Sequence, residues 1–174
     1  MAMYIYTLNI FFSNYMVIRG WYSQDFSLLM IIIAQGFTTL FIPVFAYLVS
    51  PKNYKKFMVL AICAIGVIAI LFFNYASSLP ILIIGISLYA LANGYISAVV
   101  FYYMYSLLGI EFRCSITSLA WAIPATLIGG ASLPVAQVLA ENNLENIIVT
   151  IVIIFSGMSF LSVKTIKPMP SDND

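Results

Sequence analysis

The sequence predicts an all-α fold, a polytopic membrane bundle of six transmembrane helices. Of the 174 residues, 63% are hydrophobic and only 7% are charged, with a mean hydropathy of +1.06. In a soluble domain roughly a quarter of the residues are charged. A helix needs about 20 mostly apolar residues to cross the hydrocarbon core, and six runs approach or exceed that length. These runs are continuous and do not alternate apolar with polar residues, which favours helices over the strands of a membrane barrel.

The six expected spans follow one another with short connections. The first is short and carries three polar residues, Asn9, Ser13 and Asn14. The connection at 20–25 reads GWYSQD and, like the others, leaves no room for a soluble domain. We therefore expect one transmembrane domain over 1–163, followed by a polar cytoplasmic tail over 164–174. The expected spans are 4–18, 26–49, 57–73, 79–107, 116–139 and 147–163.

The basic residues predict how the chain is oriented. Arg19 alone falls on one side of the expected bundle. The opposite side carries the other six: Lys52, Lys55, Lys56, Arg113, Lys164 and Lys167. Short cytoplasmic connections carry an excess of Lys and Arg. We therefore expect a multi-pass protein of the inner (plasma) membrane with both termini in the cytoplasm, embedded in the lipid bilayer.

The fifth expected span contains residues that weaken helices in water. It includes Pro124, Gly129, Gly130 and Pro134. Helices in lipid associate through close packing, which small residues allow, and prolines can bend them. One stripe of the fifth span repeats every four residues, and a second occurs in the fourth span: Ser118, Ala122, Thr126, Gly130 and Pro134, then Ala90, Gly94 and Ala98. These residues suit either a static, tightly packed bundle or helices that bend and slide during transport.

Two segments carry a resemblance to a known family. Arg113 and Ser115, followed by an apolar helix, the Gly129-Gly130 pair and Pro134, resemble the penultimate helix of major facilitator superfamily transporters. The metabolite:proton symporters of that family, such as the proline/betaine transporters, are the most similar branch. The stretch AYLVSPKNYKKF at 46–57 resembles the family loop G-x-L-x-D-[RK]-x-G-[RK]-[RK]. Ser50 stands at its acidic position and Asn53 at its second glycine.

The resemblance implies a function for the whole chain. Such transporters have two six-helix halves, each an inverted three-plus-three repeat. The six spans resemble the C-terminal half, so the resemblance implies half of a secondary active transporter. Its partners would be a small polar solute of the proline/betaine or organic acid class, a proton, and a second six-helix half. No ionisable residue lies inside an expected span, so proton coupling would reside in that second half. The alternatives are a truncated, non-transporting remnant or a small membrane accessory subunit.

Polar residues within the apolar runs are the candidates for a substrate pathway. Because a buried polar group in lipid needs a partner, each either faces a solute or hydrogen-bonds a neighbouring helix. Aromatic rings among them suit a quaternary ammonium group through cation–π contact. Arg113 either pairs with Glu111, closes a cytoplasmic gate, or only marks topology. The pathway candidates are Asn14, Tyr15, Gln35, Asn93, Tyr95 and Trp121; the gating and packing candidates are Arg113, Gly94, Gly129, Gly130, Pro124 and Pro134.

Other classes of function have little support in the sequence. There is no histidine, no carboxylate pair and no nucleophile motif, so we expect no enzyme activity. The two cysteines, Cys63 and Cys114, are 51 residues apart and fit no metal-binding spacing. The net charge of +1 includes no basic patch for nucleic acid. We expect neither a metal nor another cofactor.

Overall fold

The computed structural model describes residues 6–49, 53–105 and 113–165. All of its regular elements over these ranges are helices, which confirms the predicted all-α class. In chain order they are η1 (Tyr6–Phe11), α2 (Phe12–Ile18), α3 (Gln24–Leu48), α4 (Tyr54–Tyr75), α5 (Leu79–Tyr105), α6 (Arg113–Pro124), η3 (Ala125–Gly129), α7 (Gly130–Glu141) and α8 (Glu145–Thr165). The two η elements are π-helical turns.

Five described stretches are long and apolar enough to cross a membrane. They are α3, α4, α5 up to Val100, the combined run Ser115–Glu141, and α8. The first expected span is described only over η1 and α2, which are six and seven residues long. That length falls short of the roughly 20 residues that a crossing helix needs. Five membrane-length helices are therefore established for the described chain, and the six-span count stays a prediction.

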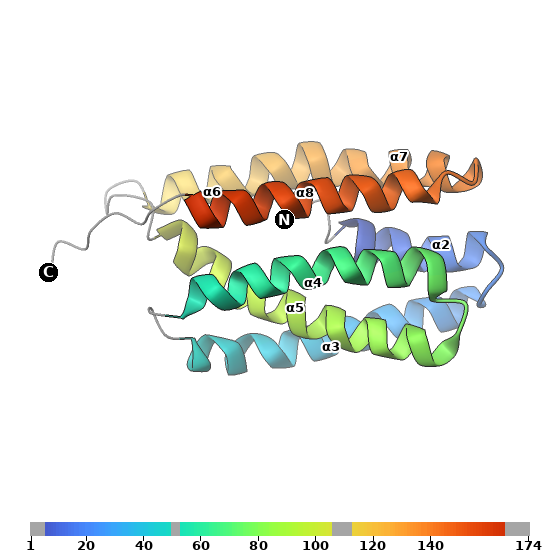
Figure 1. The fold of residues 1–174 in the computed structure, drawn as a ribbon, viewed down its shortest axis with the longest axis horizontal. Coiled ribbons are helices and arrows are strands. Elements are labelled where there is room, and N and C mark those ends of the chain that lie inside the picture. The colour runs from blue at the N-terminus through green and yellow to red at the C-terminus, as the bar shows by residue number, and fades with distance from the viewer. Residues whose placement is uncertain (1–5, 50–52, 106–112, 166–174) are drawn as a thin grey trace, which may run out of the picture.

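The helices run side by side along the long axis of the molecule (Figure 1). The turns after α2, α4 and α7 lie at one end, which we call the closed end. The last residues of α3 and α8 and the first residues of α4 lie at the other, which we call the groove end. Lys55, Lys56 and Lys164 belong to the groove end, whereas Arg19 and Glu145 belong to the closed end.

Local signals explain where the helices at the closed end start and stop. Gly20, at φ +65°, follows α2 in a left-handed conformation that suits glycine at a helix end. Ser23 begins α3, because its side chain accepts a hydrogen bond from the Phe26 backbone N–H. Asn143, at φ 58°, makes the tight turn between α7 and α8, and Asn tolerates this conformation better than most residues.

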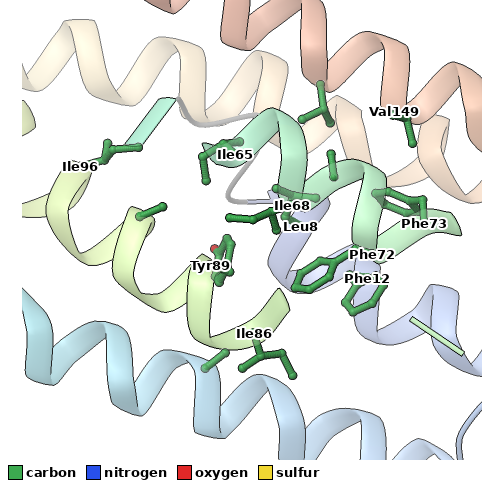
Figure 2. Packing of buried hydrophobic residues seen from close by; sticks show 14 of the residues in the cluster. Leu8, Phe12, Ile65, Ile68, Phe72, Phe73, Ile86, Tyr89, Ile96 and Val149 are labelled. Carbon is green, nitrogen blue, oxygen red and sulfur yellow. The ribbon is translucent and has the colours of Figure 1, made fainter. Parts of the chain in front are cut away.

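The core is centred on α4 and α5. About half of the most apolar stretch of each is buried, 50% and 56%, compared with 11% for α3 and 18% for the run Ser115–Glu141. Figure 2 shows how the centre is filled: Phe12 of α2 lies against Phe72 of α4, with Leu8 of η1 and Tyr89 of α5 nearby. The rings of Phe12 and Phe72 are stacked at 4.1 Å. α3 and the run from α6 to α7 thus flank a core built from α4, α5 and α2.

Candidate substrate pathway

Polar side chains at the closed end form a connected cluster around Arg19. Its Nη1 donates to Asn143 Oδ1 at 2.7 Å, its Nη2 is ion-paired with Glu145, and its Nε donates to the Tyr15 hydroxyl at 3.2 Å. The guanidinium carbon lies 5.5 Å from the centre of the Tyr15 ring, within cation–π range. The hydrogen bond with Tyr15 is the main cause that raises the pKa of Arg19. The cluster therefore ties the end of α2 to the start of α8 through a permanent cation.

Tyr15, a pathway candidate from sequence, is fully buried. Its hydroxyl donates to the backbone carbonyl of Phe73 at 3.0 Å, and its ring meets the Phe73 ring edge-on at 4.9 Å. The Trp21 ring packs against its other side at 5.5 Å. Because both its hydroxyl and its ring are engaged with protein groups, Tyr15 joins α2 to α4 and leaves no surface for a solute.

Tyr95, another pathway candidate, lies in a separate aromatic pocket near the groove end. Its hydroxyl donates to the backbone carbonyl of Tyr54 at 3.0 Å. The ring lies 5.4 Å from Phe45 and 6.0 Å from Phe57. These rings line a largely apolar cavity of about 240 Å³ between the end of α3 and the start of α4. Tyr15 and Tyr95 thus hold opposite ends of α4 and do not share a site.

Asn93 and Gly94 lie side by side in the middle of α5. A Cβ atom on Gly94 would lie 2.9 Å from Phe41 Cβ and 3.3 Å from the Thr38 carbonyl, so α3 and α5 touch closely here. Asn93 is 4% exposed, and its Oδ1 accepts no hydrogen bond within the described chain. Of the pathway candidates whose side chains are described, Asn93 has the buried polar atom that most needs a partner.

A groove of about 350 Å³ separates α8 from α4 and α5 at the groove end. Its walls are apolar apart from two serines of α8, and three methionines supply flexible, polarisable surface. The lining residues are Met58, Ile62, Ile96, Val100, Met104, Phe155, Met158, Ser159, Ser162 and Val163. None of these was a pathway candidate, since apolar runs carry no signal that distinguishes a groove wall from a lipid-facing surface.

The remaining pathway candidates lie elsewhere. Asn14 is exposed and lines a shallow cavity of about 250 Å³ with Gln24 and Gln137. Gln35 is half-buried on α3, where its backbone carbonyl accepts a hydrogen bond from Thr39. The side chain of Trp121 lies outside the described part of the structure, as does that of the gating candidate Arg113. The candidates with described side chains therefore do not meet in one cavity.

The stripe of small residues expected to pack α6 and α7 against neighbours is exposed instead. Ser118, Ala122, Thr126, Gly130 and Pro134 all lie on the exposed face. Gly130 has open space where a Cβ would be, and Pro134 lies in α7 without being packed. The prediction that this stripe packs within the chain is therefore wrong. The sequence pattern identified small residues but could not tell which of two small faces meets the bundle.

The face that packs is one step around the helix. Ser132, Ala136 and Ala140 of α7 are buried, as is Gly129. A Cβ on Gly129 would lie 2.6 Å from the Tyr6 ring, so η3 approaches η1 closely at this point. Pro124 ends α6 where the backbone changes to the π-helical turn η3. Such turns interrupt helices often at functional sites.

Two groups of polar residues were missed from the sequence. Arg19 and Glu145 have opposite charges on the same expected side of the membrane, a signal that was available. Tyr89 precedes Asn93 by four residues, which puts both on one helix face. Further buried polar atoms with no hydrogen-bond partner within the described ranges belong to Thr7, Asn9, Thr38, Thr117 and Ser156.

Over the described ranges, no three His, Cys, Asp or Glu residues lie together in a way that could hold a metal ion. Comparison with protein-family models, with curated proteins and with solved structures gave no match for this chain. The likeness to major facilitator transporters therefore depends on the quoted sequence segments alone.

Proposed function

We propose that the chain is one half of a secondary active transporter for a small polar metabolite or compatible solute, of the proline/betaine or organic acid class. On this proposal the solute moves by symport with protons. A second six-helix half, which is either another chain or a second copy, supplies the coupling carboxylates. The proposal extends the established observation of five membrane-length helices with the family likeness of the segments around Arg113 and after α3.

The observation that carries the proposal is the uncovered face of α6 and α7. The exposed stripe defined above consists of small residues, and lipid chains need no such surface. A second helix does need it, because helices in lipid approach closely only where side chains are small. α3 is also largely uncovered, with 11% of its most apolar stretch buried. Both flanks of the core are thus available to a second half.

The difference between the two ends supports the same proposal. Two-half transporters open to one side of the membrane at a time, by rocking around a central site. Here Arg19 and Glu145 tie α2 to α8 at the closed end, whereas a groove of about 350 Å³ separates α8 from α4 and α5 at the other end. A half-transporter open to one side has this form.

Uptake measured at several protein densities tests the proposal. Proteoliposomes are prepared with one chain per vesicle or with many, and uptake of labelled proline, glycine betaine and α-ketoglutarate is driven by an inward proton gradient. If two copies assemble, uptake appears only at high density and rises with the square of the density. Uptake proportional to density contradicts the half-transporter proposal, because single chains would then transport.

Cross-linking through the exposed stripe separates a second copy from a different partner. Thr126→Cys lies on the stripe, and Ile128→Cys on the far side of the same turn is the matched control, both in a background with Cys63→Ser and Cys114→Ser. We expect disulfide dimers for the Thr126 variant only if the second half is another copy. The absence of both dimers and uptake at every density, with no co-purifying membrane chain, supports the non-transporting remnant or accessory subunit.

The lysine-rich groove end is the end that we propose faces the cytoplasm. Asn53→Cys lies at this end and Ser78→Cys lies at the closed end, and both positions are exposed. A membrane-impermeant thiol reagent added outside intact cells should label the Ser78 variant alone. Labelling of the Asn53 variant alone would reverse the orientation and place the groove on the outer side.

A further inference from the structure

One face of α5 forms a continuous buried stripe that faces α4. Its members recur every three or four residues, which is the repeat of a single helix face. They are Leu82, Ile86, Tyr89, Asn93, Ile96 and Val100, and all are buried. Figure 2 shows Tyr89 projecting from α5 toward α4, between Ile86 and Ile96 along the helix. Two polar side chains thus interrupt an otherwise apolar stripe in the middle of the bundle.

Both polar side chains have an atom without a hydrogen-bond partner within the described chain. Tyr89 is 1% exposed and Asn93 is 4% exposed. The Tyr89 hydroxyl and Asn93 Oδ1 make no hydrogen bond there. An unsatisfied polar group is costly inside a protein and more so at membrane depth, where bulk water is absent. The two atoms therefore require a partner that is not part of the described chain.

The groove provides a route to these atoms. Ile96 and Val100, which belong to the α5 stripe, also line the groove of about 350 Å³. Asn93 comes one helical turn further into the bundle, and Tyr89 one turn beyond it. At the closed end the stripe is covered, since the Tyr89 ring packs 6.3 Å from Phe72 and Phe72 stacks on Phe12. The polar pair is thus at the inner end of a path that starts at the groove end.

The chemistry of the pair selects the occupant. A tyrosine hydroxyl both donates and accepts, and Asn93 Oδ1 accepts, so the occupant must donate to Asn93. The stripe carries no charged residue, and neither does α4 beyond Lys56, so an ion would lack a counter-charge. We propose that Tyr89 and Asn93 form the inner end of a site for an uncharged hydroxyl-bearing molecule, which is water or the hydroxyl group of a small solute.

Solute binding at this site depends on the proposed transport function, whereas hydration of the site does not. Any charged group of a transported solute would be bound by the second half. The experiments below use the chain in lipid vesicles and need no transport. Labelling without uptake would leave the site in place and overturn only the transporter, so the two proposals fail separately.

Cysteine accessibility tests whether the path is hydrated. Asn93→Cys is made in the background with Cys63→Ser and Cys114→Ser, and it is labelled with hydroxyethyl methanethiosulfonate. Ile65→Cys is the matched control, since Ile65 is fully buried in α4 away from the stripe. Because thiols react as the hydrated thiolate, we expect the Asn93 variant to react at least about tenfold faster than the Ile65 variant. Equal rates would overturn the proposal.

Two further variants keep the test decisive. If Asn93→Cys does not elute as folded protein, Tyr89→Cys carries the same expectation against the same control. Val100→Trp added to the Asn93 variant fills the groove, and it should slow labelling by at least about tenfold if the groove is the route. Unchanged labelling in the presence of Val100→Trp would contradict the route and thereby the site as proposed.

The choice of reagent tests the class of occupant. Hydroxyethyl methanethiosulfonate is neutral, and its trimethylammonium and sulfonate analogues are charged. With rates normalised to the exposed Asn53→Cys variant, the charged analogues should be slower at position 93 by about tenfold or more. Equal normalised rates would exclude a site selective for uncharged molecules. Saturable protection by glycerol would indicate a hydroxylated solute, and labelling unaffected by glycerol would indicate water; both support the shared chemistry.

Discussion

The two ends of the bundle are built from the same helices but are packed differently. At the closed end α4 meets α2 through rings in contact, with Phe12 stacked on Phe72 at 4.1 Å and Tyr15 edge-on to Phe73 at 4.9 Å. At the groove end α4 and α5 are separated from α8 by a groove of about 350 Å³. Rings in contact fix the distance between helices, whereas methionine side chains adapt to it.

This difference indicates which part of the molecule can move. η1 and α2 are short, and they are inserted between α4 and α7 toward the closed end, where Arg19 also ties α2 to Asn143 and Glu145. We infer that α8 pivots about this end relative to α4 and α5. The groove would then widen or narrow while the closed end stays packed, which is the kind of motion that a rocking transporter half needs.

Removal of a ring at the closed end should have the largest effect. Phe12 is fully buried, so Phe12→Ala should lower the free energy of unfolding by about 3 kcal/mol through lost contacts and a residual cavity. Phe155→Ala is the matched change at the groove end. Because Phe155 borders an existing groove, the loss there should be about 1 kcal/mol. Reversible unfolding in mixed micelles measures both, and equal losses would mean that the two ends are packed alike.

The groove end is not loose everywhere, because α3 is held tightly against α5. Gly94→Leu would force a side chain into Phe41 and the Thr38 backbone, and we expect a loss of about 2 kcal/mol. Gly157→Leu on α8 is the control, since nothing lies within 4 Å of its added Cβ. That variant should be no less stable than the parent in the same unfolding assay. A comparable loss at Gly157 would show that α8 is packed where we find a groove.

The ionic tie at the closed end should contribute less than the rings. The Arg19 and Glu145 side chains are 21% and 24% exposed, so solvent screens their attraction. A double-mutant cycle with Arg19→Gln and Glu145→Gln should give a coupling of about 1 kcal/mol. The coupling should fall in 1 M salt, where screening extends over about 3 Å. A coupling near zero at low salt would leave the aromatic rings as the only tie.

Hydropathy could predict the helical fold because lipid permits few alternatives. A continuous apolar run that must satisfy its backbone within a membrane forms a helix. The run predicted over 57–73 lies within α4 (Tyr54–Tyr75), and the run over 147–163 lies within α8 (Glu145–Thr165). The π-helical turns η1 and η3 could not be predicted, since they depend on how neighbouring helices meet. η3 follows Pro124, and the sequence indicated a bend there without its form.

The candidate site could be predicted only in part. Asn93 was identified because an amide in an apolar run needs a partner, and it is the candidate with an unpartnered buried atom. Tyr15 was selected by the same reasoning, but the carbonyl of Phe73 satisfies its hydroxyl. A polar residue in a sequence reveals the need for a partner and not which partner meets it. The groove was missed altogether, because its walls are apolar residues like those that face lipid.

Two neighbouring glycines should mark where packing of the first helical segment against η3 and α7 stops. A Cβ on Gly129 would lie 2.6 Å from the Tyr6 ring, whereas a Cβ on Gly130 would meet nothing within 4 Å. Gly130→Ala should therefore stabilise the fold by about 0.5 kcal/mol, because alanine loses less chain entropy in a helix. Gly129→Ala should lose about 0.5 kcal/mol, since the Tyr6 ring must shift to admit the methyl group. Thermal unfolding of the two variants side by side measures effects of this size. Stabilisation by both substitutions would mean that η1 does not pack on η3, so that the first helical segment is held only by α2 and the Arg19 cluster.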